Sequence, residues 1–101
     1  MAELVVIYKT PTDPAAFDKY YVATHIPLAK KLPGLKKYQV SSGAVGGPGG
    51  SAVHLVATLT FDSVPAIEAA LGSPEGQAAA GDLPNFATGG ADIIFYETKE
   101  V

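Results

Sequence analysis

Cysteine and arginine are both missing from this sequence of 101 residues. Without cysteine the chain offers no disulfide, no thiolate nucleophile and no zinc–thiolate site. All seven basic residues are lysines, so the planar guanidinium that grips carboxylates and phosphates at two points is missing too. These absences favour a neutral or apolar ligand over an anionic one.

Positive charge is scarce, and the formal net charge is −3. Nucleic acid is disfavoured as a partner, because phosphate binding requires clustered cations that outweigh the acids. Long apolar runs are also missing, and the apolar first eight residues carry Glu3 and no basic region. The sequence therefore predicts neither a signal peptide nor a membrane span. We expect a cytoplasmic protein with no membrane partner.

Apolar residues are abundant: they make up 48% of the chain, against 17% for charged residues. We expect a single domain over residues 1–101, because this length is enough for one domain and too short for two. A domain of this size buries only about two-thirds of its unfolded surface. The surplus apolar side chains must then line a cavity or enter an interface, which predicts a homodimer.

The periodicity of apolar residues predicts the order of the secondary structure. Alternating or β-branched runs indicate strands at residues 4–8, 35–42, 52–61 and 91–98. Apolar residues at three- and four-residue steps predict a helix over residues 14–32, which Pro27 should kink. Shorter helices should follow the capping residues Ser63 and Ser73. This β-α-β-β-α-β order predicts an α+β, ferredoxin-like domain with a four-stranded antiparallel sheet.

The third predicted strand has two different faces. The apolar face, which belongs under the helices, comprises Val53, Leu55, Ala57, Leu59 and Phe61. The other face is semi-polar and suits a lined cavity, with His54, Val56, Thr58 and Thr60. Helices cover only one face of such a sheet. A second copy on the bare face would enclose a shared cavity and complete a dimeric α/β barrel.

The glycine-rich segment 43–50 separates the second and third predicted strands. A hairpin turn is its simplest interpretation. A phosphate-binding loop is excluded, because no Lys-Ser or Lys-Thr pair follows and the next element is a strand instead of a helix. Its further role stays open.

His25 and His54 are the only histidines and the natural acid–base candidates. His25 lies beside the predicted kink, where it either bonds an exposed backbone carbonyl or acts in catalysis. His54 lies on the semi-polar strand face, where it either faces the cavity or ends in solvent at the hairpin. The two do not form a metal site by their spacing, and no cluster of histidines or carboxylates supplies further ligands.

Tyrosine is frequent, with five in the chain. Its ring and hydroxyl suit the wall of a pocket for aromatic or oxygenated ligands, although core or rim positions are the ordinary alternative. Tyr8 and Tyr38 are the foremost candidates, because one side of their strands should face the cavity. Asp82 is polar in an otherwise apolar segment, where it either caps the turn at Leu83 or works in the site. A Ser-His-Asp triad has no nucleophile elbow to support it.

Several short motifs follow one another along almost the whole chain. They are Tyr20-Tyr21, Thr24-His25-Ile26-Pro27-Leu28, Leu32-Pro33-Gly34-Leu35, Ser73-Pro74-Glu75-Gly76 and Asp82-Leu83-Pro84-Asn85-Phe86. In this order the sequence resembles the EthD-like family, which takes its name from the degradation of a fuel ether. The resemblance implies a dimeric α/β barrel with a pocket between sheet and helices. Proteins that share this architecture include lactone isomerases, quinone-forming monooxygenases, polyketide cyclases and haem-handling enzymes.

The resemblance carries His25 over as the catalytic residue, and Tyr20, Asp82 and Phe86 as residues of the pocket. It implies a small catabolic enzyme without a cofactor, an oxidoreductase or isomerase acting on a small hydrophobic oxygenated compound. The substrate-binding set expected around His25 is Tyr8, Tyr20, Tyr38, His54, Asp82 and Phe86. Two alternatives stay open: a non-catalytic binding or accessory protein of an oxidative degradation pathway, and a haem protein that uses His25 as its ligand.

Overall fold

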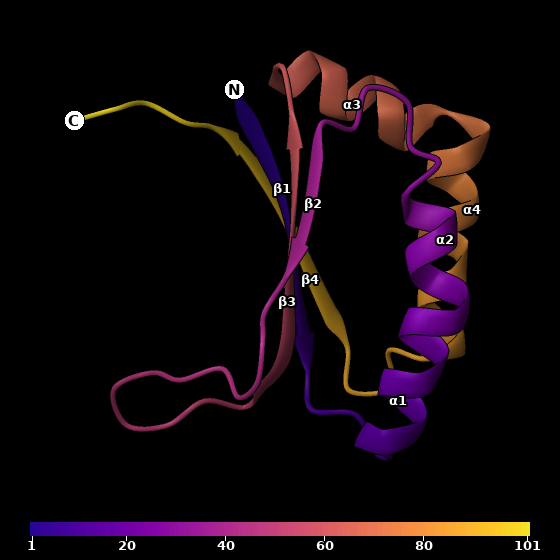
Figure 1. Cartoon of the computed structure of the whole chain (residues 1–101), viewed down its shortest axis with the longest axis vertical. Helices are drawn as coiled ribbons and strands as arrows, with labels where there is room; N and C mark the ends of the chain where they lie inside the picture. Colours follow the sequence, from indigo (N-terminus) through magenta and orange to yellow (C-terminus); the bar gives the residue numbers. More distant parts are fainter.

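Four strands form one antiparallel sheet in the spatial order β2-β3-β1-β4. They are β1 (Ala2–Lys9), β2 (Lys37–Val40), β3 (Val53–Phe61) and β4 (Ala91–Glu97). The computed structural model, which describes residues 1–101, places all helices on one face of this sheet (Figure 1). The main helices are α1 (Pro14–Tyr20), α2 (Ile26–Ala29), α3 (Val64–Gly72) and α4 (Pro74–Asp82). The predicted α+β, ferredoxin-like fold is confirmed.

The strand register turns alternate side chains under the helices. Leu59 of β3 pairs with Leu4 of β1 on one side and with Tyr38 of β2 on the other. Leu4 and Leu59 are buried, as is Phe61 two residues further along β3. They share one core with Ile67 of α3. The prediction that this face of β3 lies under the helices is therefore confirmed.

A bulge changes the orientation of His54. Tyr8 pairs with Leu55 but Lys9 pairs with Val53, so His54 is an extra residue on β3. Such an insertion breaks the two-residue alternation and twists the strand. The His54 side chain consequently reaches α1, where its Nε2 lies 2.7 Å from a carboxylate oxygen of Asp18. The expected place for His54, on the semi-polar face of the strand, differs from the observed one for this reason.

Pro27 interrupts the first helical segment as predicted, but through a π-helical turn. Proline has no N–H, so the carbonyl of Ala23 has no donor four residues later. Over Tyr21–His25 the helix widens, and the Ile26 N–H donates to the carbonyl of Tyr21, five residues earlier. Helices α1 and α2 still form one column in Figure 1. The widened turn brings both Tyr21 and His25 into the buried face.

Helices α3 and α4 meet at a tight junction. Ser63 and Ser73 accept hydrogen bonds from N–H groups in the first turns of α3 and α4, which confirms both as helix caps. Gly76 lies where the two helices cross, and a Cβ atom there would overlap the carbonyl oxygen of Ala70. Only glycine allows α4 to turn back this closely. The junction sets the direction of α4 and the place of Asp82 at its end.

The other face of the sheet carries no helix. Segment 43–50 and the carboxyl-terminal residues project from this side, away from the helices (Figure 1). Strand β4, at the edge of the sheet, exposes four consecutive large apolar side chains, from Ile93 to Tyr96, each to between 39% and 48%. None of the helices has the length and apolar character needed to cross a membrane.

Replacing Gly76 by alanine should destabilise the fold. The new methyl group must displace backbone of α3, and overpacking of this kind costs about 1–3 kcal/mol. Gly81 is the matched control, because it lies in the same helix and a Cβ there meets nothing within 4 Å. Gly81→Ala should be neutral or stabilise by up to about 1 kcal/mol through helix propensity. Urea denaturation measures both, and equal effects would contradict the close packing of α3 on α4.

Candidate active site

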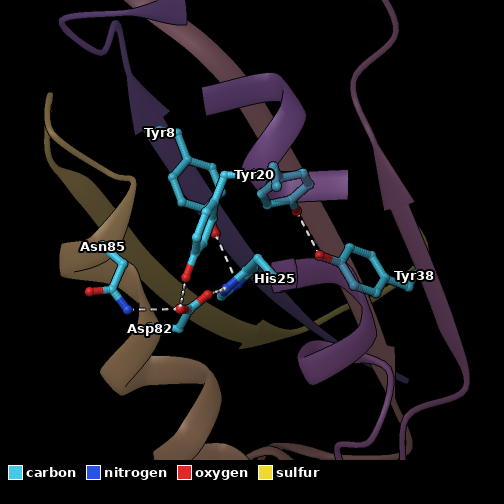
Figure 2. A network of polar contacts seen from close by, with 7 residues as sticks. Tyr8, Tyr20, His25, Tyr38, Asp82 and Asn85 are labelled. Carbon is cyan, nitrogen blue, oxygen red and sulfur yellow. Dashed lines mark hydrogen bonds and ion pairs between the residues drawn. The ribbon is translucent and has the colours of Figure 1, made fainter. Parts of the chain in front are cut away.

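His25 ends the π-helical turn and is only 5% exposed. Its Nδ1 lies 3.0 Å from Oδ2 of Asp82, and its Nε2 lies 3.4 Å from the hydroxyl of Tyr8 (Figure 2). Phe86 packs against the imidazole with ring centroids 4.7 Å apart. His25 thus bonds to two side chains from distant parts of the chain and to no backbone carbonyl. The interpretation that it holds the kink by a carbonyl bond is not supported.

Asp82 ends α4 and is as buried as His25, with 6% exposure. Its Oδ1 accepts hydrogen bonds from the hydroxyl of Tyr20 at 2.6 Å and from the amide of Asn85 at 3.0 Å. Burial by itself raises the pKa of this carboxyl group. The hydrogen bonds from Tyr20, Asn85 and His25 and the charge of His25 outweigh burial, and hold the pKa of Asp82 below its ordinary value. Asp82 is therefore a carboxylate at neutral pH.

The ionised Asp82 determines which nitrogen of His25 carries the proton. A carboxylate only accepts, so Nδ1 donates to it, and Nε2 of the neutral ring is left as an acceptor. Tyr8 is fitted to donate to Nε2, since burial and the nearby Tyr38 raise the pKa of its hydroxyl. The result is a chain of hydrogen bonds from Tyr8 through His25 to Asp82, in which Nε2 is the basic atom.

A second polar pair lies beside this chain. The hydroxyls of Tyr21 and Tyr38 are 2.6 Å apart (Figure 2). Burial is the largest cause that raises the pKa of each hydroxyl, so both stay protonated. Each hydroxyl has one proton, so one of the two donates to the other. When Tyr21 donates to Tyr38, the proton of Tyr38 is free to bond a third group. The pair can thus present a hydrogen-bond donor to a ligand at Tyr38.

The cavity beside His25 lies between the sheet and the helices, and its volume is about 50 Å³. Its wall is apolar except for the polar groups of Tyr8, His25 and Tyr38. In this conformation the space is large enough for only a few water molecules. Ile93 of β4 forms part of the wall and is 44% exposed. The cavity therefore borders on solvent at this edge of the sheet.

The predicted site residues separate into three groups. His25, Tyr8 and Tyr38 line the cavity. The residues Tyr20, Asp82 and Phe86 join the same cluster but stand behind His25 and are not part of the cavity wall. His54 lies apart with Asp18. This cavity is on the helix-covered face, where the family resemblance implied a pocket. The shared cavity on the semi-polar face, which a second copy would enclose, stays a prediction.

Asn85 and Tyr21 belong to the cluster although neither was among the predicted site residues. Asn85 follows Asp82 by three residues, and Tyr21 precedes His25 by four. These spacings bring side chains to one side of a helical turn, so the sequence did hold a signal for both. What it could not show was that the two turns lie side by side on the same face of the sheet.

The arrangement offers no evident place for a metal or a haem group. No group of three or more His, Cys, Asp or Glu side chains lies close enough together to hold a metal ion. Both ring nitrogens of His25 already have partners. A cavity of about 50 Å³ is also far below the roughly 300–1,000 Å³ of common ligand pockets. The haem interpretation thus finds no support in this geometry.

The conserved pattern of a known family covers most of this chain. The model of the EthD domain matches residues 9–90, which include His25 and Asp82 but not Tyr8. The chain belongs to the EthD family. It is 37% identical to an uncharacterized 11.0 kDa protein of Rhodococcus erythropolis, encoded between thcB and thcC, over all of this chain and 98% of that one. An EthD family protein of Bacillus halodurans is 33% identical and has a TM-score of 0.88, with 98% of this chain and 99% of that one covered.

More distant structures share the fold of this EthD protein. A cofactor-independent oxygenase of Streptomyces nogalater, SnoaB, is 17% identical with a TM-score of 0.67, over 99% of this chain and 94% of that one. A dimeric ferredoxin-like protein of Bacteroides fragilis is also 17% identical with a TM-score of 0.68, over 96% and 95%. At these identities the likeness establishes the architecture alone.

Asp82→Asn should change how the stability of this EthD protein depends on pH. The pKa of Asp82 is lower in the folded than in the unfolded state. Ionised Asp82 therefore contributes fully to the free energy of unfolding above its unfolded-state pKa, and this contribution is lost as the pH falls through its folded-state pKa. The variant should be about 1–3 kcal/mol less stable at pH 7, because buried partners lose an ionised acceptor. It should also lose less stability on acidification. Urea denaturation between pH 7 and acid measures both, with the exposed Asp62→Asn as control.

Proposed function

We propose that this EthD-family protein is a cofactor-independent enzyme that removes a proton from a small, apolar, oxygenated compound. The observation that carries the proposal is the orientation of His25. Its Nδ1 is held by the buried carboxylate of Asp82, while its Nε2 points towards the apolar cavity and Tyr8. A histidine so oriented is a general base.

The first chemical step is the same for both reaction classes that we consider. Nε2 of His25 takes a proton from a carbon next to a carbonyl group or a phenolic ring, and Asp82 stabilises the imidazolium that forms. When the substrate reaches Nε2 it takes the place of Tyr8 there, so the hydroxyl of Tyr8 is free to donate, together with that of Tyr38, to the oxygen on which negative charge develops. The apolar wall strengthens these interactions, since charges act over longer range away from water.

The fate of the anion separates the two classes. In an isomerisation, His25 returns the proton to another carbon of the same molecule, and nothing else is consumed. In an oxidation, the anion reacts with O₂, so that a CH₂ group becomes a carbonyl and water is released. The shared fold of the Streptomyces oxygenase supports the second class only as architecture. The wall supports both, because it is apolar with a few hydroxyl groups.

A binding or accessory role is the second candidate. The apolar wall with its hydroxyl groups would hold a ligand whether or not a reaction follows. Binding alone, however, needs neither an ionised carboxylate behind the histidine nor an acceptor nitrogen facing the ligand. This is the reason for preferring an enzyme. Turnover by the wild type, and its loss without His25, distinguishes the two.

We also propose that the protein works as a homodimer, with a second copy covering the open face of the sheet. The bare face carries Val5, Ile7, Val56 and Ile94 among polar neighbours. Ile94 is 48% exposed there. A few kilocalories per mole are available from burying each such side chain. The dimeric protein of Bacteroides fragilis has the same fold.

His25→Ala should abolish turnover while the protein stays folded. Loss of a general base costs about 10²–10⁴-fold in kcat. The assay follows O₂ consumption with small compounds that carry a CH₂ group next to a carbonyl or phenolic ring, and absorbance with small lactones, both chosen to suit the narrow cavity. His54→Asn is the control, because His54 lies outside the cavity, and it should retain at least half of the wild-type rate. Undiminished turnover in a folded His25→Ala protein would overturn the proposed function.

Ile94→Glu should convert the dimer into a monomer, because a charge would then be buried in the interface at high cost. Sedimentation velocity reports the change directly. Val22→Glu is the matched control, since Val22 is 66% exposed on the outer side of the helical layer, and it should sediment as the wild type does. A wild-type protein that stays monomeric at micromolar concentration would contradict the dimer.

A further inference from the structure

Tyr20 and Asn85 do not contribute to the cavity wall, yet both hold Asp82. The hydroxyl of Tyr20 and the amide of Asn85 bond the same carboxylate oxygen, Oδ1. The other oxygen, Oδ2, is the one that bonds His25. The two carboxylate oxygens are thus bound by two different sets of groups, and Figure 2 shows Asn85 on the side of Asp82 away from His25.

Tyr20 and Asn85 also line a separate groove, and Asp82 does not. The apolar residues Phe17 and Phe86 line the same groove. Phe86 also packs on His25 and stacks with Tyr20 at 5.4 Å between centroids. A layer made of Tyr20, Phe86 and Asp82 therefore separates the solvent-open groove from the cavity. A change to Tyr20 or Asn85 can act on His25 only through this layer.

We infer that Tyr20 and Asn85 are positioning residues, which keep Asp82 ionised and aimed at His25 from outside the cavity. This inference rests on the proposed function for its consequence in catalysis, but its structural part stands alone. It replaces the expected role of Tyr20 in binding substrate. A carboxylate that accepts only from His25 could rotate or take up a proton. Either change would break its hydrogen bond with Nδ1, and the imidazole ring would no longer be held in one orientation.

The groups around Asp82 support this reading. Its titratable neighbours are Tyr20 from α1 and His25 from the π-helical turn, with Tyr8 of β1 next to His25. No lysine forms an ion pair with Asp82; its only ion-pair partner is His25. The two neutral donors, Tyr20 and Asn85, therefore supply much of what offsets the burial of the carboxylate. The bond from Tyr20 is the larger of their contributions to the lowered pKa of Asp82.

The first test uses the ligand-free protein and needs no substrate. Carboxyl ¹³C NMR follows the titration of Asp82 in the wild type and in Tyr20→Phe, Asn85→Ala and Tyr96→Phe. We expect the midpoint of Asp82 to rise by about 0.5–1 pH unit in Tyr20→Phe, by less in Asn85→Ala, and not at all in Tyr96→Phe. Ring ¹⁵N signals report whether Nδ1 of His25 still donates, with His54 as an internal reference. An unmoved Asp82 midpoint in folded Tyr20→Phe would overturn the inference.

The second test measures steady-state kinetics on the substrate identified with the wild type. Because Tyr20 lies outside the cavity, Tyr20→Phe should lower kcat by about 3–10-fold and leave KM within twofold. A raised KM with unchanged kcat would instead return Tyr20 to substrate binding and refute the positioning role. The two proposals can fail separately. A shifted Asp82 midpoint together with normal turnover in His25→Ala would refute the proposed function and leave the positioning role in place.

Discussion

The hydrogen bond between His25 and Asp82 is 3.0 Å long and almost fully buried, and it links the first helical segment to the last helix. His25 comes from the first helical segment and Asp82 from the end of the last helix, 57 residues later. Both groups are costly to bury unless they are paired. The fold must therefore bring them together with the correct geometry, and the remaining contacts of the cluster secure that geometry.

Two irregular features of the backbone serve this one contact. The π-helical turn before Pro27 adds a residue to the helix and so directs His25 at the sheet. Gly76 allows α4 to pack closely on α3, which brings Asp82 to the same place. Neither feature adds stability by itself, since π turns are poorly bonded and glycine is unfavourable in a helix. Both are understandable as parts of the site.

The wall of the cavity is apolar apart from three polar residues. Tyr8 belongs to the core and Tyr38 packs against it, so packing holds both hydroxyls in place. The ligand that we propose for this site is a small molecule recognised by its shape and by one or two oxygen atoms. The absence of arginine agrees with it, because no guanidinium is available to bind a carboxylate or phosphate.

Sequence reasoning alone determined the order of elements, the helix caps at Ser63 and Ser73 and the interruption at Pro27. These depend on local periodicity and on steric rules that act within a few residues. The choice of His25 as the central candidate came from the family resemblance. Sequence reasoning misplaced His54, since a bulge depends on how two strands pair and not on one strand's alternation. Only the tertiary structure decided that Asp82 bonds His25 and that Tyr20 bonds the other oxygen of Asp82 outside the cavity. Those facts arise from packing between segments that are distant along the chain, where side-chain direction is set by the partner.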